Sequence, residues 1–148
     1  MLLAQAGYIG VGAWLAHIDI WEHRLPNRIV APLAVGILAL AIAHAATGSA
    51  AALARAGTGA ILLGGFYFLL RAASGRALGG GDVKLAIPTG MVLAWDGWPA
   101  LIAGGGLAFV LGGASATLLL ATRRGTRSTE IPFGPYMVLG AVLGLAVT

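Results

Sequence analysis

The chain has 148 residues, of which 59% are hydrophobic and only 9% are charged, with a formal net charge of +4. Soluble domains carry roughly 25% charged residues, so this composition excludes a protein whose whole surface lies in water. The chain has no cysteine, which excludes a disulfide framework and a cysteine-based zinc site. Its nine basic residues are scattered rather than clustered, which favours lipid over nucleic acid as the partner.

Six apolar segments are predicted, at about residues 1–18, 29–46, 57–71, 83–95, 98–122 and 132–148. A helix needs roughly 17 to 25 apolar residues to cross a bilayer, and the first, second, fifth and sixth segments reach or approach this length. The third and fourth segments are short, and the fourth contains Pro88. We therefore predict an all-α, multi-pass membrane protein of about six helices, with residues 1–148 forming one domain.

The basic residues occur in alternate loops. Eight of the nine lie in or beside the loops that follow the first, third and fifth segments: Arg24, Arg28, Arg71, Arg76, Lys84, Arg123, Arg124 and Arg127. Under the positive-inside rule these loops face the cytoplasm, which requires all six segments to cross the membrane. Both termini are then predicted to lie outside the cytoplasm.

Small residues and tryptophans have structural interpretations. Small residues recur every four positions in the fifth and sixth segments, at Gly104, Ala108, Gly112, Ala116, Gly140 and Gly144. This spacing allows helices to approach closely in lipid. Four tryptophans lie near predicted segment ends and are expected to anchor the chain at the membrane interface: Trp14, Trp21, Trp95 and Trp98.

Only five residues are acidic, and three of them have simple explanations. Asp96 precedes Gly97 between two apolar segments, where aspartate is a common turn residue. Glu22 and Glu130 lie in polar loops near basic residues, so solvation or a surface ion pair accounts for both. The other two acids are the candidates for chemistry.

Asp19 and Asp82 lie at the edges of apolar segments. Asp19 ends the first segment and Asp82 opens the fourth, so the loop charges place both at the same interface. An ionisable group there is a functional candidate, although each carboxylate could instead cap a helix or pair with Arg24 or Lys84. Two carboxylates in one partly desolvated site share a proton, and such a pair activates water against a peptide carbonyl without a metal.

Three glycines, Gly79, Gly80 and Gly81, precede Asp82 in the sequence GGGDVKL. Non-helical backbone at membrane depth occurs only where it lines a cavity or is buried in protein. We expect these glycines to interrupt the helix, open space beside the carboxylate and let an extended substrate approach. A phosphate-binding loop is the weaker interpretation, because the P-loop spacing is missing and Asp82 repels anions.

The three histidines, His17, His23 and His44, are widely spaced, and no His-Glu-x-x-His sequence is present. Zinc ligands usually lie closer together or beside a glutamate, so we predict structural or surface roles for these histidines. The sequence therefore predicts no metal and no other cofactor.

Three motifs together resemble the type IV prepilin peptidases, a branch of the G-x-G-D membrane aspartic peptidases. GGGDVKL carries the G-x-G-D-x-K-L pattern at Gly79, Gly81, Asp82, Lys84 and Leu85. The stretch DIWEHRLPNRI is similar to the first catalytic motif, which is carried by Asp19, Pro26 and Asn27. The stretch EIPFGPYMVLG resembles the C-terminal motif, which is carried by Pro132, Phe133, Gly134 and Pro135.

The resemblance implies a peptidase that removes the short basic leader from prepilins or pseudopilins in the cytoplasmic membrane of a prokaryotic cell. Asp19 and Asp82 are then the catalytic pair facing the cytoplasm, and Lys84 holds the loop, tunes Asp82 or extends toward the headgroups. The compact layout is similar to the peptidases of tight-adherence (Flp) pili. Larger members carry a cysteine-containing insertion and methylate their product; here Asp19 follows the first helix directly, so methylation is not expected.

A different class of protein is also compatible with these features. Carboxylates within a membrane serve proton relays, and glycine-broken helices line transporter sites, so a small proton-coupled transporter or a non-catalytic pilus assembly component is the alternative. A transporter favours acids near the bilayer midplane, whereas Asp19 and Asp82 are predicted at one interface.

Overall fold

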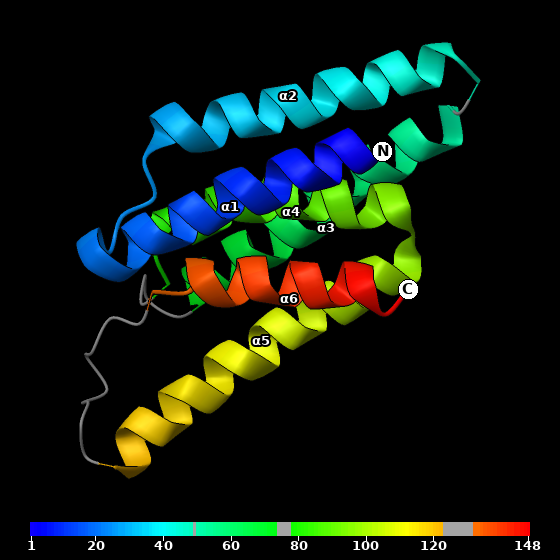
Figure 1. The fold of residues 1–148 in the computed structure, drawn as a ribbon. Helices are drawn as coiled ribbons and strands as arrows, with labels where there is room; N and C mark the ends of the chain where they lie inside the picture. The colour runs from blue at the N-terminus through cyan, green and yellow to red at the C-terminus, as the bar shows by residue number, and fades with distance from the viewer. Residues whose placement is uncertain (49, 74–77, 123–131) are drawn as a thin grey trace.

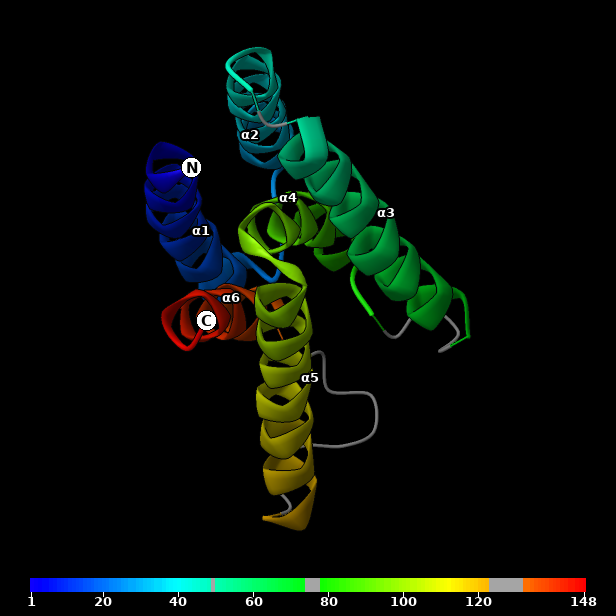
Figure 2. The same ribbon diagram turned by 90° about the vertical axis from the view of Figure 1, so that its right-hand side faces the viewer.

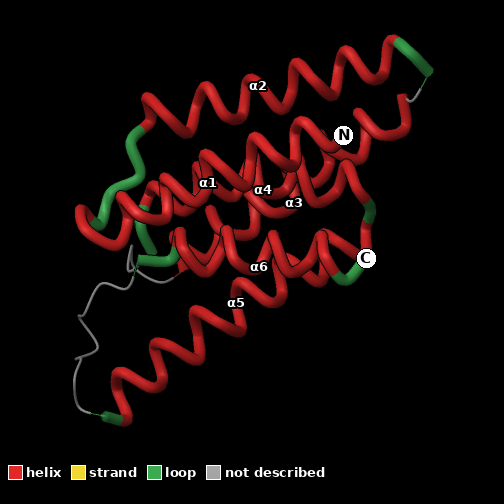
Figure 3. The backbone as a smooth tube through the Cα atoms, viewed as in Figure 1, coloured by secondary structure: helices red, strands yellow, loops and turns green. Residues whose placement is uncertain are grey.

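The computed structural model describes residues 1–48, 50–73, 78–122 and 132–148. Within these ranges the regular structure is helical, as Figure 3 shows. The six helices are α1 (Leu2–Glu22), α2 (Asn27–Ala46), α3 (Ala50–Ala73), α4 (Gly80–Asp96), α5 (Trp98–Ala121) and α6 (Gly134–Ala146). Helices α2, α3 and α5 are long and apolar enough to cross a membrane, and α6 is a shorter apolar helix. The predicted fold class is confirmed.

Helix α4 is the central helix of the bundle. It contacts each of the other five helices, and Figure 2 shows it with α1, α2, α3, α5 and α6 around it. The helix continues through the buried Pro88. A buried hydrogen bond of 2.8 Å between the hydroxyls of Tyr8 and Thr89 joins α4 to α1. Because the Thr89 hydroxyl donates to the Leu85 carbonyl at 2.7 Å, Tyr8 is the donor to Thr89.

Helix α3 is longer than the sequence predicted. The expected segment of residues 57–71 is a 24-residue helix, Ala50–Ala73, so the prediction of a short third segment is wrong. The third predicted segment began at residue 57, so Arg55 was left outside it. Its guanidinium instead donates from within α3 to the carbonyls of Ala94 and Trp95, each at 3.3 Å. It thereby satisfies carbonyls at the end of α4 that have no partner within that helix.

Glycines allow two helix pairs to make backbone contact. A Cβ on Gly140 of α6 would lie 2.5 Å from the Ala108 nitrogen, and a Cβ on Gly144 would lie 2.5 Å from the Gly104 Cα. The predicted close packing of the fifth and sixth segments is therefore correct at these positions. Gly112 differs, because its missing side chain makes room for the Phe133 ring rather than for α6. Between α3 and α4, Gly59 and Gly90 each face the other's carbonyl oxygen.

The tryptophan prediction holds only in part. Trp21 and Trp98 lie at helix ends and are 75% and 42% exposed, as an interfacial position requires. Trp95 is only 2% exposed, and its ring centroid lies 5.8 Å from that of His44, so the interfacial prediction for Trp95 is wrong. Its helix is central, so even the last turn of that helix is enclosed. Trp14 is exposed but lies well inside α1, away from the helix ends.

The contact between α3 and α4 gives a stability prediction. Gly59→Ala places a Cβ against the Gly90 carbonyl, which is backbone and cannot rotate away. We expect a loss of about 1–3 kcal/mol, measured as a lower midpoint of thermal unfolding in detergent. The control is Gly57→Ala, two residues earlier on α3, where a Cβ meets nothing within 4 Å. An equal or higher midpoint for Gly59→Ala than for the control would contradict the packing.

Candidate active site

Asp19 and Asp82 lie at the same end of the bundle. Asp19 is in the last turn of α1 and Asp82 is in the first turn of α4. Both line one cavity of about 760 Å³, and their carboxylates interact electrostatically. The two residues are only 5% and 6% exposed. Two acids 63 positions apart in the sequence therefore line one cavity, as their predicted location at one interface requires.

The first residue of α6 holds Asp19. The backbone N–H of Gly134 donates to the Asp19 Oδ2 at 3.0 Å in a buried hydrogen bond. A Cβ on Gly134 would lie 2.7 Å from that oxygen, so a side chain at this position would displace the carboxylate. Gly134 is the first residue of α6, where the helix dipole also favours negative charge. The sequence IPFGP thus supplies a hydrogen-bond donor at a place that only glycine fits.

Of the other residues of that motif, Phe133 makes the packing contacts. The Phe133 ring packs against the ring of Tyr67 on α3, with centroids 5.7 Å apart, and fills the space left by Gly112 on α5. Pro132 lines the cavity. Pro135 lies in the first turn of α6, where a proline loses no helical hydrogen bond.

The glycines before Asp82 act differently from the prediction. Gly80 and Gly81 form the first turn of α4, and Gly79 is the extended residue before it, so these glycines begin the helix rather than interrupt it. A Cβ on Gly81 would lie 2.7 Å from the Leu25 Cβ, and one on Gly79 would lie 2.9 Å from the Asp82 Oδ2. Their missing side chains therefore let the α1–α2 loop and the carboxylate approach the backbone.

Lys84 joins the GGGDVKL motif to the DIWEHRLPNRI motif. Its Nζ donates to the Asn27 Oδ1 at 2.8 Å, and both residues line the cavity. Asn27 begins α2, and Pro26 is the extended residue before it. Of the roles considered for Lys84, this contact supports holding the loop.

The sequence prediction missed Arg71 as a residue of the cavity. Its guanidinium donates to the Leu78 carbonyl and interacts electrostatically with Asp82. The only sequence signal for Arg71 was its position at the end of an apolar segment, before a run of glycines. Any basic residue on the cytoplasmic side of a membrane helix can have such a position.

His23 was predicted to be structural or at the surface. It lines the cavity from the end of α1 with a left-handed backbone (φ 51°), and it interacts electrostatically with Asp19.

Several predicted residues lie outside the described part of the chain, namely Arg76, Arg123, Arg124, Arg127 and Glu130. Among the described residues, no group of three or more histidine, aspartate or glutamate side chains could hold a metal ion. The two buried carboxylates that line the cavity can exchange protons with a substrate or with water.

Comparison with known proteins identifies one protein family over most of the chain. The family model of the type IV leader peptidase family matches residues 7–148. The chain is 31% identical to a prepilin leader peptidase/N-methyltransferase of Stutzerimonas stutzeri, over 95% of this chain and 50% of the relative. It is 33% identical to a protein of the same name from Dickeya chrysanthemi, over 99% of this chain and 51% of the relative.

The chain thus spans about half the length of these curated relatives. No solved structure matches it significantly. The family match includes the Asp19 motif, the GGGD turn and the PFGP loop that the fold brings together. The chain belongs to the type IV leader peptidase family.

Proposed function

We propose that this chain is a membrane aspartic endopeptidase that removes the short basic leader from type IV, Flp-like prepilins or pseudopilins, with Asp19 and Asp82 as its catalytic pair. The observation that carries the proposal is the burial of both carboxylates in one cavity. Family membership supports the class of substrate.

In the proposed reaction the two carboxyl groups hold one proton between them, because two like charges in a buried site repel each other. The ionised carboxylate takes a proton from water as the water oxygen attacks the peptide carbonyl carbon. The protonated carboxyl then gives its proton to the leaving amine as the C–N bond breaks. One proton enters the pair and one leaves it, so the pair again holds one proton. The carboxyl group that acted as the base is then the protonated one, and the two aspartates exchange roles in the next turnover.

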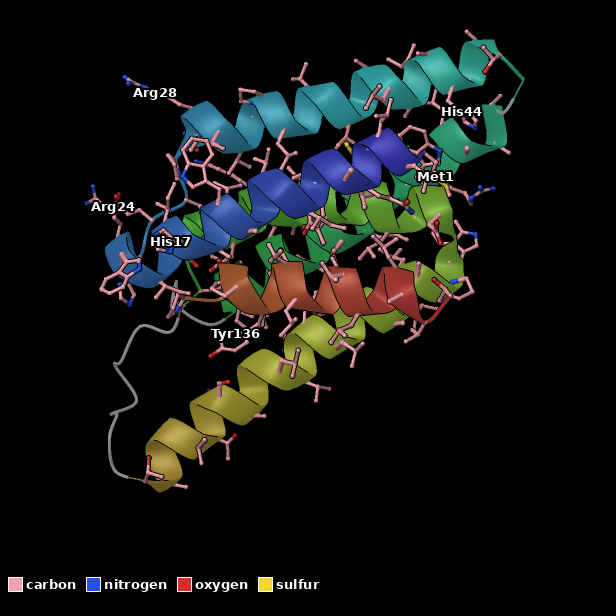
Figure 4. All side chains as sticks on the ribbon, in the orientation of Figure 1. Met1, His17, Arg24, Arg28, His44 and Tyr136 are labelled. Atoms are coloured by element: carbon pink, nitrogen blue, oxygen red, sulfur yellow. The ribbon has the colours of Figure 1, made fainter. Side chains whose placement is uncertain are left out.

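The distribution of charge supports a cytoplasmic location for the cavity. Figure 4 shows Arg24 and Arg28 at the end of the bundle that holds the α1–α2 loop, and Met1 and His44 at the other end. Both termini lie at the end away from that loop, as Figure 1 shows. Under the positive-inside rule the cavity then opens at the cytoplasmic interface, where a basic leader emerges from the membrane.

The alternative function, a proton-coupled transporter or an assembly component, fits these positions less well. A transporter places its ionisable groups near the bilayer midplane. Asp19 and Asp82 instead lie in the last turn of α1 and the first turn of α4.

The first test of the proposal removes each acid in turn. Asp19→Asn and Asp82→Asn are each expected to lower the rate of leader removal about 10³-fold, because each variant lacks one member of the proton-transfer pair. The assay combines the chain with a type IV prepilin in proteoliposomes and follows the product by gel mobility and mass. The same mass spectrum tests the expectation that the product stays unmethylated.

The matched control is Asp96→Asn at the far end of α4. Asp96 accepts a hydrogen bond from the Gln5 Nε2 at 2.9 Å, and an asparagine oxygen can still accept it. We expect this variant to retain the activity of the parent. Trimming that persists in both Asp19→Asn and Asp82→Asn would contradict the proposal and favour the alternative.

The second test concerns the donor to Asp19. Gly134→Ala forces the Asp19 carboxylate to move, and a displacement of about 1 Å is expected to lower kcat about 10²-fold. Gly113→Ala on α5 is the control, because a Cβ there meets nothing within 4 Å. Equal turnover in the two variants, measured in the same assay, would show that the position of Asp19 does not limit catalysis.

A further inference from the structure

One buried hydroxyl near the cavity has no explained role. Tyr67 on α3 is only 1% exposed, and among the described residues no group lies within hydrogen-bonding distance of its hydroxyl. A buried polar group without a partner costs about 1–3 kcal/mol. Such a group calls for a physical reason, which the resting structure does not supply.

The packing of the Tyr67 ring does not supply that reason. The ring makes edge-on contacts with Phe66 and Phe133, with centroid distances of 5.7 Å in both cases. A phenylalanine would make the same contacts without burying an unpaired hydroxyl. The ring is therefore accounted for by packing, and the oxygen is not.

The Tyr67 hydroxyl is related to Asp82, and the Tyr67 ring contacts the residue before Gly134. The hydroxyl interacts electrostatically with the Asp82 carboxylate. Arg71, which also interacts with Asp82, lies four residues later on α3 and therefore on the same face of the helix. Tyr67 also packs against Phe133, the residue before the Gly134 N–H that holds Asp19.

Tyr8 provides an internal comparison. Its side chain is as deeply buried as that of Tyr67, and its hydroxyl also interacts electrostatically with Tyr67. The Tyr8 proton, however, is already donated to Thr89, at 2.8 Å. Of these two buried phenols, only Tyr67 therefore keeps a proton free for another acceptor.

We propose that Tyr67 is a positioning residue, whose hydroxyl donates a hydrogen bond to the Asp82 carboxylate when a substrate occupies the cavity. The inference rests on the proposed peptidase function. No bond to the phenol is made or broken, and its proton stays on the oxygen. This hydrogen bond and the Arg71 guanidinium of the cavity lining together orient Asp82, so Asp82 keeps one geometry through the proton transfers.

The test removes one oxygen atom. Tyr67→Phe is expected to lower kcat about 10- to 100-fold, which corresponds to the loss of a hydrogen bond to a charged group. KM is expected to stay within about twofold, because the hydroxyl acts on Asp82 rather than on the substrate. The midpoint of thermal unfolding should stay equal or rise, because the variant no longer buries an unpaired hydroxyl.

Tyr8→Phe is the matched control, since it removes the same atom from a buried phenol that has a partner. Its unfolding midpoint is expected to fall and its kcat to stay at the parent value. The two variants should therefore show opposite patterns, one in turnover and the other in stability. Both are assayed as full chains in proteoliposomes with a prepilin as the probe.

Three results would overturn the inference. A parental kcat in Tyr67→Phe, beside an inactive Asp82→Asn, would overturn it while leaving the peptidase function intact. A fall in both kcat and unfolding midpoint in Tyr67→Phe would assign the hydroxyl a structural role. An inactive parent chain would overturn the proposed function and this inference together.

Discussion

The burial of two carboxyl groups in the lining of one cavity is the constraint on which the rest of the structure depends. A carboxylate removed from water needs hydrogen-bond donors, and a second carboxylate nearby makes that need greater. Asp19 receives the Gly134 N–H, and Asp82 receives the Gly79 N–H. Both donors belong to the backbone at the start of a helix, where the N–H groups have no partner within the helix. The two helix starts thus supply a hydrogen-bond donor to each acid, and Arg71 adds a positive charge that interacts with Asp82.

The same constraint accounts for the central position of α4. A helix that buries Asp82 in the lining of a cavity must be surrounded, and α4 contacts all five of the other helices. Close contact between helices in lipid depends on small residues rather than on the hydrophobic effect. Gly59 and Gly90 bring α3 against α4, while Gly81 lets Leu25 approach the turn that carries Asp82. Glycine therefore has the same role in the bundle and in the site, because its missing side chain lets neighbouring groups approach the backbone.

Much of this arrangement could be predicted from the sequence. Apolar runs and loop charges indicated six helices, and the rarity of acids in an apolar chain singled out Asp19 and Asp82. The features that the sequence did not indicate depend on contacts between residues far apart in the chain. Arg55 was left outside the third predicted segment because its acceptors, Ala94 and Trp95, belong to another helix. The Tyr67 hydroxyl, which has no hydrogen-bond partner within the described ranges, also has no sequence signal, because a pattern shows that a residue is apolar but not whether its oxygen finds a partner.

The most direct measurement of the central claim is the proximity of positions 19 and 82 in the membrane. The chain has no cysteine, so Asp19→Cys combined with Asp82→Cys introduces the only two thiols. A short bifunctional thiol reagent applied to membranes should join them within one chain, which the intact mass reports as one added linker with both thiols consumed. The pair Asp19→Cys and Asp96→Cys, with its second thiol at the far end of α4, should take up two separate linkers. Two linkers on the first pair as well would contradict a shared catalytic cavity.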